Sequence, residues 1–516
     1  MSLVEVADLE VAFGHEPPVV REVSFTVADG ECLALVGESG SGKSVTARAL
    51  LGLNGATARV SAATLRIGGT DARGFTERDW KGLRGRGVGV VLQDALASLD
   101  PLRRIEDEVA EPLRLHRRGS RAERRERVLE VLAEVGIPDP ETRSRQYPHQ
   151  LSGGLRQRAL IASALVAEPD LVIADEPTTA LDVLVQDQIL ELLGKIKEQG
   201  RGLLLISHDL AVVARLADRI AVMKEGRIVE IGPRDQVIDS PQHSYTKYLL
   251  GIARGRRDDR PAVPDGDLMV EVDGVSRSFG ERRAVTGVSL SLRARQTVGL
   301  VGESGSGKST LARMVMGLTA PHEGRVLLGG EPWSETTERA RRRRRRRIQL
   351  IQQDPHAAFD PRHTVGRVIA EALPGLRGGP RRARVTDLLA TVGLDASLAA
   401  RRPHQLSGGQ RQRVAIARAL AVEPEVLICD EPVSALDVSV QAQVLDLLSE
   451  LQQRLGIAML CITHDLGVVA QISDRLLIMK DGEVVEEGAT KTVFENPQHP
   501  YTNALLRAAP RLPGPR

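Results

Sequence analysis

The chain contains Gly37-Glu38-Ser39-Gly40-Ser41-Gly42-Lys43-Ser44 and repeats it, letter for letter, at Gly302-Glu303-Ser304-Gly305-Ser306-Gly307-Lys308-Ser309. Both copies fit the pattern G-x-x-x-x-G-K-[ST], whose glycines let backbone N–H groups surround a triphosphate. The lysine is expected to reach the terminal phosphates, and the last serine is expected to hold Mg²⁺. One Gly-Ser-Gly run can be a plain flexible turn. Two identical copies instead indicate that the chain binds two nucleotides.

Each loop has the sequence context that this chemistry requires. It follows a short apolar run, at residues 33–36 and 298–301, which predicts a strand. It precedes a segment with apolar residues at helical spacing, so it would lie at a helix N-terminus, where the helix dipole favours anions. The apolar helix positions are Ala47, Leu50 and Leu51 in one half and Leu311, Val315 and Met316 in the other.

The rest of the sequence is duplicated as well. At 516 residues the chain exceeds one ordinary core, and about 150 residues per domain suggests roughly two to four units. The motifs Leu-Ser-Gly-Gly, Asp-Glu-Pro and His-Asp-Leu follow each loop in the same order, which indicates two main units. Residues 254–267 are charged and rich in Pro and Gly, so they predict a linker. The expected domains are residues 1–253 and 268–516.

The charge balance argues against a general affinity for nucleic acid. Lys and Arg (70) nearly equal Asp and Glu (68), so the net charge of +2 gives no global attraction to polyanions. Residues 341–347 are seven consecutive arginines, a run that can serve as a nucleic-acid or targeting signal. The first half also has a basic segment, with Lys81, Arg84 and Arg86, before its matching apolar run. We therefore interpret the arginine run as a solvated flank and expect no nucleic-acid partner.

Cysteine usage and hydropathy narrow the class of protein further. Cys32, Cys429 and Cys461 lie in or beside apolar runs without C-x-x-C spacing, which predicts small buried side chains in a reducing compartment. The start of the chain lacks the cationic and apolar segments of a signal peptide. No apolar stretch approaches the roughly 20 residues that span a bilayer. The sequence therefore predicts a soluble protein with no membrane pathway of its own.

Two carboxylates stand at the end of a predicted buried strand in each half. The apolar runs 171–174 and 426–429 are each followed by Asp-Glu-Pro. Asp175 and Asp430 are placed to organise Mg²⁺ and its waters. Glu176 and Glu431 are candidate bases that orient the attacking water. A single Asp-Glu-Pro after a strand is more often the polar start of a turn. Because it follows a phosphate loop along the chain in both halves, it predicts a hydrolysis site.

A Ser-Gly-Gly triplet precedes a helical run in each half. These triplets are Ser152-Gly153-Gly154 and Ser407-Gly408-Gly409, each after a leucine. The serine can simply cap the helix, or the serine hydroxyl and glycine N–H groups can grip a γ-phosphate. At these residues the chain resembles the ATP-binding cassette (ABC) family, whose signature is Leu-Ser-Gly-Gly-Gln. The second half matches through Gln410, whereas the first half has Leu155 in the fifth place.

The resemblance covers nearly the whole chain and implies the fold. That fold is α/β, with two tandem P-loop NTPase domains of the ABC type, each with a mixed or parallel sheet core, an antiparallel β portion and a helical subdomain. The resemblance also implies ATP and Mg²⁺ as cofactors. Gln93 and Gln353 resemble the Q-loop glutamines, which contact Mg²⁺ and relay to a membrane partner. The implied metal ligands are Ser44, Gln93, Asp175, Ser309, Gln353 and Asp430.

Two further pairs of residues acquire roles only through the family. His208 and His464 each follow an apolar strand and resemble the switch histidine that contacts the γ-phosphate. A single histidine in that place is more often structural, but this one recurs in the right order. Phe13 and Phe279 lie where the family presents an aromatic ring to adenine, although either can equally be a core residue.

The resemblance also implies that the two cassettes pair within the chain. In the family the phosphate loop of one cassette faces the signature of the other, so hydrolysis requires closure. Lys43 and Glu176 would then meet the second signature, and Lys308 and Glu431 would meet the first. Covalent linkage makes this pairing intramolecular, and we expect two hydrolytic composite sites. The D-loops expected to cross the interface are Ala180-Leu181-Asp182 and Ala435-Leu436-Asp437.

Within the family the chain resembles the ATPases of oligopeptide and dipeptide importers. The resemblance rests on residues 147–154 and 403–407 before the signatures, and on the tails at residues 241–246 and 497–502, Pro-Gln-His-x-Tyr-Thr. It implies two integral-membrane permeases as partners and, indirectly, a substrate-binding protein outside the cell. The chain would lie peripherally on the cytoplasmic side of the membrane. Relatives that handle nickel or glutathione remain an alternative.

A different class also has two cassettes in one chain: soluble ATPases that act on ribosomes or DNA. Ribosome-acting relatives place a long charged helical arm between their cassettes, and the short Pro/Gly-rich linker is poor material for such an arm. The zinc-binding cysteines of the repair ATPases are missing from the sequence. The arginine run is the only feature in their favour, so the transport interpretation is preferred.

Overall fold

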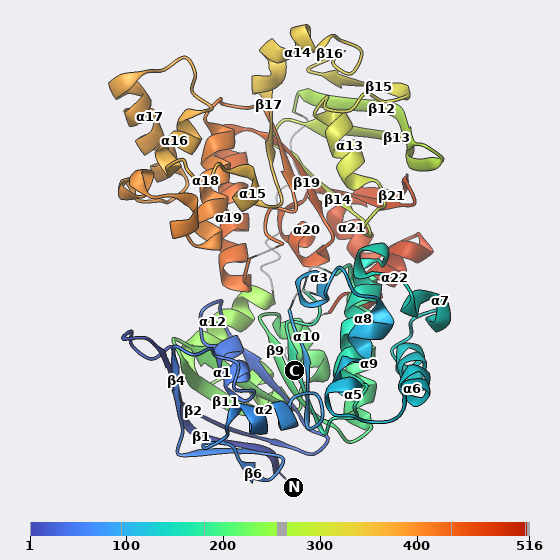
Figure 1. The fold of residues 1–516 in the computed structure, drawn as a ribbon. Coiled ribbons are helices and arrows are strands. Elements are labelled where there is room, and N and C mark those ends of the chain that lie inside the picture. The colour runs from blue at the N-terminus through green and yellow to red at the C-terminus, as the bar shows by residue number, and fades with distance from the viewer. Residues whose placement is uncertain are drawn as a thin grey trace. The chain divides into compact units, whose positions relative to one another are not determined.

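The structure is a computed structural model and describes residues 2–93, 95–179, 181–254, 266–434, 436–510 and 512. The chain divides into two compact units, one of Met1–Arg254 with Pro510–Arg516 and one of Gly255–Ala509 (Figure 1). Most of the predicted linker, at residues 255–265, lies outside the described residues. Each unit has its own sheets and hydrophobic cores.

A six-stranded sheet forms the centre of the first unit. Its strands are β3 (Cys32–Val36), β7 (Val88–Val91), β8 (Leu171–Asp175), β9 (Gly202–Ser207), β10 (Arg219–Lys224) and β11 (Arg227–Pro233). Their order is β11-β10-β3-β9-β8-β7, and every neighbouring pair is parallel except β10 with β11. β3 and β8 are buried at every position, as expected for a sheet covered on both faces.

A second, antiparallel sheet covers one face of the central sheet. It has the order β2-β1-β5-β6, with β4 also paired to β1. Alternate residues of β3 pack into different cores, because successive side chains of a strand point to opposite faces. Leu33 and Leu35 join the core under the antiparallel sheet, whereas Cys32, Ala34 and Val36 join the core under the helices. The bounds are β1 Ser2–Phe13, β2 Val20–Ala28, β4 Ala58–Ser61, β5 Thr64–Ile67 and β6 Thr70–Asp71.

Helices complete the first unit, and a helical portion is inserted between β7 and β8 (Figure 1). Within it, α8 packs against α3, α4 and α6. The bounds are α1 Lys43–Ala49, α2 Glu77–Leu83, α3 Ala95–Ser98, α4 Ile105–Val109, α5 Glu111–Leu115, α6 Arg121–Glu134, α7 Pro140–Ser144, η1 Pro148–Gln150, α8 Gly153–Leu165, α9 Val183–Glu198, α10 Leu210–Leu216, α11 Arg234–Asp239 and α12 Ser244–Ala253.

The second unit repeats this architecture. Its central sheet has the order β17-β18-β19-β14-β20-β21, parallel except for β20 with β21, and its antiparallel sheet has the order β13-β12-β15-β16. The bounds are β12 Leu268–Phe279, β13 Arg282–Arg293, β14 Thr297–Val301, β15 Glu323–Leu328, β16 Glu331–Pro332, β17 Ile348–Ile351, β18 Val426–Asp430, β19 Ala458–Thr463, β20 Arg475–Lys480 and β21 Glu483–Ala489.

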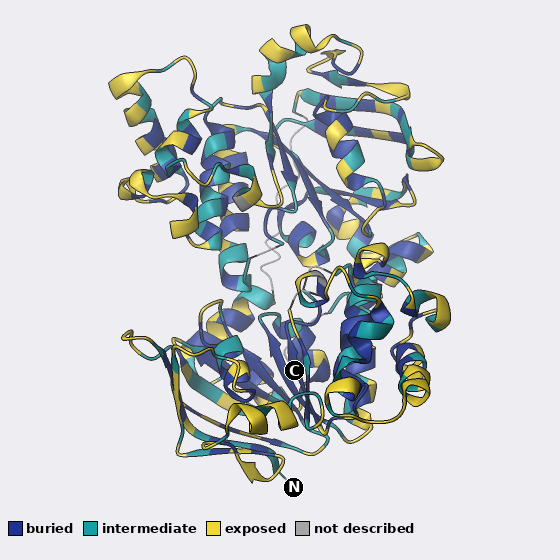
Figure 2. Cartoon of the chain, in the orientation of Figure 1, coloured by how far each residue is buried: buried dark blue, intermediate teal, exposed yellow. Residues whose placement is uncertain are grey.

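The helices of the second unit follow the same sequence order. In Figure 2 the inner strands of each central sheet are buried, while the edge strands β11 and β21 and the ends of the outer helices are not. The bounds are α13 Lys308–Val315, α14 Glu338–Arg344, η2 Arg345–Arg347, α15 Pro355–Ala358, α16 Val365–Ala370, α17 Gly378–Thr391, η3 Ala396–Ala400, η4 Pro403–Gln405, α18 Gly408–Leu420, α19 Val438–Leu455, α20 Leu466–Ile472, α21 Thr490–Glu495 and α22 Pro500–Ala508.

The predicted α/β class, with a mixed central sheet, an antiparallel sheet and a helical portion in each unit, is confirmed. The helices predicted after both loops are wrong at their ends. In the second unit α13 stops at Val315, before Met316. In the first unit α1 stops at Ala49 and leaves Leu50 and Leu51 in a turn. Gly52, with φ of +60°, closes that turn by donating its N–H to the Ala49 carbonyl. Both leucines are still buried, so apolar spacing alone did not locate the end of the helix.

The arginine run forms α14 and η2, beside the edge strand β17. Several of its side chains are engaged locally: Arg345 pairs with Glu338 at 2.7 Å, and Arg347 pairs with Glu425 at 2.7 Å. Arg344 donates to the Leu328 carbonyl and lies over the Trp333 ring. Arg341 donates to the Trp333 and Ser334 carbonyls. The other three members of the run, Arg342, Arg343 and Arg346, are exposed. These contacts agree with the interpretation of the run as a solvated flank.

Candidate nucleotide-binding sites

The phosphate loop of each unit lies between a central strand and the first turn of a helix. Lys43, the first residue of α1, donates from Nζ to the Gly37 carbonyl at 2.7 Å and to the Glu38 carbonyl at 2.8 Å. Lys308 makes the same two bonds in the second unit, at 2.6 and 2.7 Å. The loop backbone therefore holds both ammonium groups at the position from which they can reach a phosphate.

The first glycine of each loop cannot be replaced without moving the backbone. A Cβ on Gly37 would lie 2.2 Å from the carbonyl oxygen of Met223, at the end of β10. A Cβ on Gly302 would lie 2.1 Å from the carbonyl oxygen of Met479, at the end of β20. Each loop thus runs directly against the neighbouring strand, and only glycine permits that approach.

Asp175 and Asp430 end β8 and β18, as the sequence predicted. Ser44 Oγ donates to Asp175 Oδ1 at 3.0 Å, whereas Ser309 is exposed. Burial, together with the neighbouring glutamate, raises the pKa of both aspartates. A cation beside these carboxylates would favour their charged form.

The donor set fits Mg²⁺ held jointly with a nucleotide. A hydroxyl and a carboxylate are hard oxygen ligands, and Mg²⁺ usually takes one or two carboxylates plus phosphates and waters. Within the described residues, no group of three or more His, Cys, Asp or Glu side chains could hold a metal alone. The protein therefore supplies only some of the ligands that Mg²⁺ needs, and the phosphates of a bound nucleotide and waters would supply the others.

In the first unit, the buried Glu176 pairs with the half-buried His208. His208 Nδ1 lies 2.8 Å from Glu176 Oε1, and Thr179 Oγ1 donates to the other carboxylate oxygen at 2.9 Å. Glu176 has φ of +52°, a conformation that is uncommon for residues other than glycine and often marks functional sites. The strained backbone aims the carboxylate at the histidine.

The second unit has the same pair with one extra partner. His464 Nδ1 lies 3.0 Å from Glu431 Oε1, and Glu431 has φ of +47°. Gln353 Nε2 donates to Glu431 Oε2 at 2.7 Å. Gln353 and its counterpart Gln93 are both exposed, and Asp94, which follows Gln93, lies outside the described residues. The structure thus brings a Q-loop glutamine to the glutamate in the second unit.

The glutamate–histidine pair favours the ionised forms of both partners. Burial opposes the charge on Glu176, but the hydrogen bond and charge of His208 outweigh it, so the Glu176 pKa lies below its usual range. Burial likewise opposes the charge on His208, and Glu176 outweighs it, so the His208 pKa is raised. The Glu431 pKa is also lowered, because the His464 contact outweighs burial. An ionised carboxylate is the form that can accept a proton from water.

The signature serines cap helices in both units. Ser152 Oγ accepts from the Leu155 N–H at 3.4 Å at the start of α8. Ser407 Oγ accepts from the Gln410 N–H at 3.3 Å at the start of α18. Gln410 Oε1 in turn accepts from the Ser407 N–H at 3.1 Å, which completes a capping box. The Leu155 side chain has no oxygen to accept a hydrogen bond from the Ser152 N–H. The first signature therefore lacks the capping box of the second.

The two candidate adenine-stacking rings differ in exposure. Phe279 is 51% exposed at the end of β12, with the Arg277 guanidinium 5.1 Å from its ring centre. Phe13, at the end of β1, is half-buried and packs against the core under the antiparallel sheet. In the D-loops, Ala180 and Ala435 lie outside the described residues.

The sequence analysis missed one contact of each loop. The Glu38 N–H donates to the Tyr245 hydroxyl at 3.2 Å, and the Glu303 N–H donates to the Tyr501 hydroxyl at 3.2 Å. Both tyrosines belong to the repeated tail motif, Pro-Gln-His-x-Tyr-Thr, that served only as a mark of the importer subfamily. The repetition of this motif in both halves was the sequence signal that could have indicated a role for the two tyrosines.

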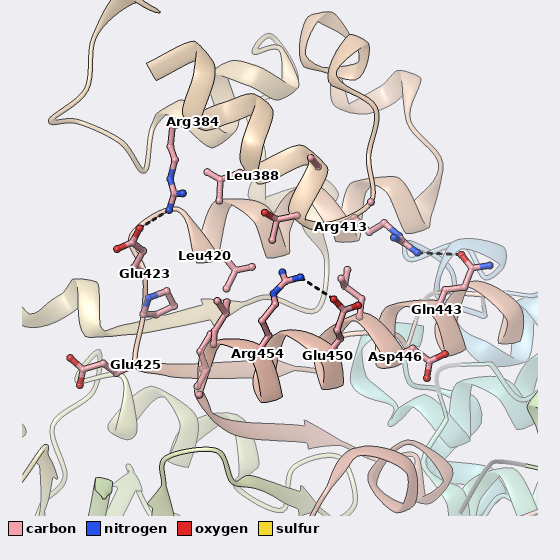
Figure 3. A pocket seen from close by; sticks show the side chains of 18 of the residues that line it. Arg384, Leu388, Arg413, Leu420, Glu423, Glu425, Gln443, Asp446, Glu450 and Arg454 are labelled. Atoms are coloured by element: carbon pink, nitrogen blue, oxygen red, sulfur yellow. Dashed lines mark hydrogen bonds and ion pairs between the residues drawn. The ribbon is translucent and has the colours of Figure 1, made fainter. Parts of the chain in front are cut away.

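A hollow of about 1180 Å³ lies elsewhere in the second unit, and none of the candidate nucleotide-binding residues lines it. It is bordered by α17, α18 and α19 (Figure 3). Arg384 pairs with Glu423 at 2.7 Å, and Arg454 pairs with Glu450 at 2.9 Å. Charges of both signs line the hollow, so it has no clear preference for one kind of ligand.

Comparison with known families decides the identity of the fold. A family model described as ABC transporter matches residues 20–179 and 285–434. The chain belongs to the ABC transporter family. A second model, described as the C-terminal region of oligopeptide/dipeptide transporters, matches residues 229–257 and 485–516 of this ABC protein. Both predictions of family and subfamily are confirmed, and the protein is an ATPase with two ATP-binding cassettes.

Similar proteins span the whole chain. The ABC protein is 46% identical over 527 residues to the peptidoglycan transport ATP-binding protein YejF of Agrobacterium fabrum (strain C58 / ATCC 33970), covering 98% of this chain and 96% of that protein. It is 41% identical over 558 residues to the glutathione import ATP-binding protein GsiA of Escherichia coli (strain K12), covering 99% and 90%. These relatives, like this chain, are ABC ATP-binding proteins.

A solved structure shares the fold at low identity. The archaeal ribosome recycling factor aABCE1, in its complex with the ribosomal stalk protein aP1, has a TM-score of 0.63 and 20% identity, covering 91% of this chain and 88% of that chain. At that identity the likeness concerns the fold alone. Among the described residues of this ABC protein, no helix has the length and apolar character needed to cross a membrane.

Proposed function

We propose that this ABC ATPase energises the uptake of short peptides, or of a related small solute, through two separate membrane permeases. The observation that carries the proposal is the presence, in both units, of a glutamate–histidine contact beside the phosphate loop together with the oligopeptide/dipeptide tail. The chain would act peripherally at the cytoplasmic face of the membrane, and a substrate-binding protein outside would deliver the solute.

In each unit, different residues bind ATP, activate water and hold the metal ion. Lys43 and Lys308 bind the terminal phosphates of ATP. Glu176 and Glu431 orient the attacking water and accept its proton, and their lowered pKa keeps them ionised for that task. His208 and His464 hold these carboxylates and contact the γ-phosphate. Ser44, Gln93 and Asp175, with Ser309, Gln353 and Asp430, would hold Mg²⁺, which neutralises the phosphate charge when bound.

The two cassettes would close on each other around ATP. Ser152, Gly153 and Gly154 would complete the site of Lys308, and Ser407, Gly408 and Gly409 would complete the site of Lys43. The signature serines begin helices, where N–H groups favour an anion. Closure would turn hydrolysis into movement of the attached permeases, because each ATP would be enclosed only in the paired state.

The solute class follows from the relatives. They are named for peptidoglycan transport and glutathione import, and the tail model is named for oligopeptides and dipeptides. Glutathione is itself a short peptide, so a peptide-type solute is common to most of these names. A nickel importer is the alternative within the same architecture.

The proposal is tested by identifying proteins that accompany the chain. The complex is purified from native membranes in mild detergent, and co-purifying proteins are identified. Two polytopic permeases are expected. Recovery of ribosomal proteins or DNA-repair factors without permeases would contradict the proposal. A Lys43→Ala/Lys308→Ala double variant serves as a control, since it should retain the permeases while losing hydrolysis.

A further inference from the structure

The tail of each unit touches its phosphate loop through one hydroxyl group. The Tyr245 hydroxyl in α12 accepts from the Glu38 N–H, and the Tyr501 hydroxyl in α22 accepts from the Glu303 N–H, both at 3.2 Å. The partners lie far apart in the sequence but in the same unit. The same contact in two units indicates a built feature, since an accidental approach would not be expected twice.

Each tyrosine ring is buried and lies beside a lysine ammonium group. Tyr245 is 6% exposed, and the Lys224 ammonium lies 5.1 Å from its ring centre. Tyr501 is also 6% exposed, and the Lys480 ammonium lies 5.0 Å from its ring centre. These lysines end β10 and β20, the strands against which the loops run. The ring therefore has a fixed position relative to the loop.

The rest of the tail motif fixes the start of the helix that carries the tyrosine. His243 Nδ1 accepts from the Tyr245 N–H at 3.1 Å and caps α12. The Glu230 carboxylate accepts from the N–H groups of Gln242 and His243 at 2.8 and 3.0 Å. The second unit repeats these bonds at the same distances, with Glu486, Gln498, His499 and Tyr501.

The residue that each tyrosine contacts is also contacted by the phosphate-loop lysine. Glu38 donates its N–H to Tyr245, and its carbonyl accepts from Lys43 Nζ at 2.8 Å. Glu303 has the same two partners in the second unit, with Lys308 at 2.7 Å. Loss of the hydroxyl would leave the N–H without this acceptor and free the peptide that helps place the lysine.

We propose that Tyr245 and Tyr501 are positioning residues that pre-organise the two phosphate loops for ATP. The inference rests on the ATPase assignment and adds a role for the importer-type tail within the nucleotide site. A loop held in its binding conformation loses less entropy when ATP binds. The tyrosines therefore act on nucleotide affinity, through the loop backbone, and make no contact with the reacting atoms.

The test uses the full chain and Tyr→Phe variants, which keep the ring and remove only the hydroxyl. The Kd of a fluorescent ATP analogue with Mg²⁺, and the KM and kcat for ATP, are measured for the Tyr245→Phe/Tyr501→Phe double variant. Kd and KM should rise about fivefold, the ratio that corresponds to a hydrogen bond of about 1 kcal/mol. The kcat at saturating ATP should stay within about twofold of the wild-type value.

Tyr248→Phe is the matched control, because Tyr248 lies on the same helix but is 47% exposed. Its Kd and KM should equal the wild-type values. The inference is overturned if the double variant keeps the wild-type Kd and KM, or if only its melting temperature falls. If the double variant does not fold, each single variant is measured, with the unaltered unit as an internal reference. Because wild-type ATP binding needs no permease, failure of the importer proposal would not affect this result.

Discussion

His208 Nδ1 lies 2.8 Å from Oε1 and 2.6 Å from Oε2 of the Glu176 carboxylate. The second unit repeats the contact at 3.0 Å between His464 and Glu431. Each pair joins the ends of two neighbouring central strands, so the sheet itself sets the distance between the acid and the histidine. Each glutamate–histidine contact is therefore formed within a single unit.

The two glutamates should each be needed for hydrolysis. Glu176→Gln and Glu431→Gln remove the proton acceptor and keep the shape, so each should strongly reduce turnover, and the double variant should lose at least about 100-fold. ATP binding should persist, since the phosphate loops are unchanged. Steady-state ATPase rates and nucleotide titration provide the measurements. Glu450→Gln, at an exposed ion pair, is the control. If either single variant kept the wild-type rate, the two sites would not be equivalent.

The Glu176–His208 pair should stabilise the first unit most at mildly acidic pH. The raised His208 pKa gives stability that is present below its unfolded value of 6.5 and is lost as pH rises through the folded pKa. The lowered Glu176 pKa gives stability that is present above 4.5 and is lost as pH falls through the folded pKa. Thermal melting of wild type and His208→Gln should therefore differ more at about pH 5.5 than at about pH 9. A pH-independent difference would contradict the charged pair.

The two candidate stacking rings should respond differently to truncation. Phe279 is 51% exposed, so Phe279→Ala should change the melting temperature little and raise the KM for ATP if the ring stacks on adenine. Phe13 packs on a core, so Phe13→Ala should lower the melting temperature. An unchanged KM for Phe279→Ala would remove its stacking role.

The three thiols should be unreactive in the folded protein. Cys32, Cys429 and Cys461 are buried, and burial raises the pKa of each, that of Cys461 to about 12. A chromogenic disulfide reagent at neutral pH should therefore titrate no thiol under native conditions and all three after denaturation. Rapid reaction in the native protein would show that one of the cysteine-bearing strands opens.

The sequence could predict the site residues that belong to local motifs but not all of their contacts. Asp175 and Glu176 follow a continuous apolar run, so their place at a strand end was readable from the spacing. The end of α1 could not be predicted in this way, because a turn closed by Gly52 ends the helix and apolar spacing does not reveal that turn. The contacts of Tyr245 with Glu38 and of Gln353 with Glu431 depend on the packing of distant segments. Such pairs become visible only when the sheet order is known.

Cysteine crosslinking tests the proposed pairing of the two cassettes most directly. Ser39, Ser152 and Ser407 are all exposed, and the native cysteines are buried, so introduced thiols can be read separately. With a nonhydrolysable ATP analogue and Mg²⁺, Ser39→Cys/Ser407→Cys should form an intrachain disulfide, and the same-unit pair Ser39→Cys/Ser152→Cys should not. A disulfide in the same-unit pair, or none in the cross pair, would contradict ATP sites shared between the two units.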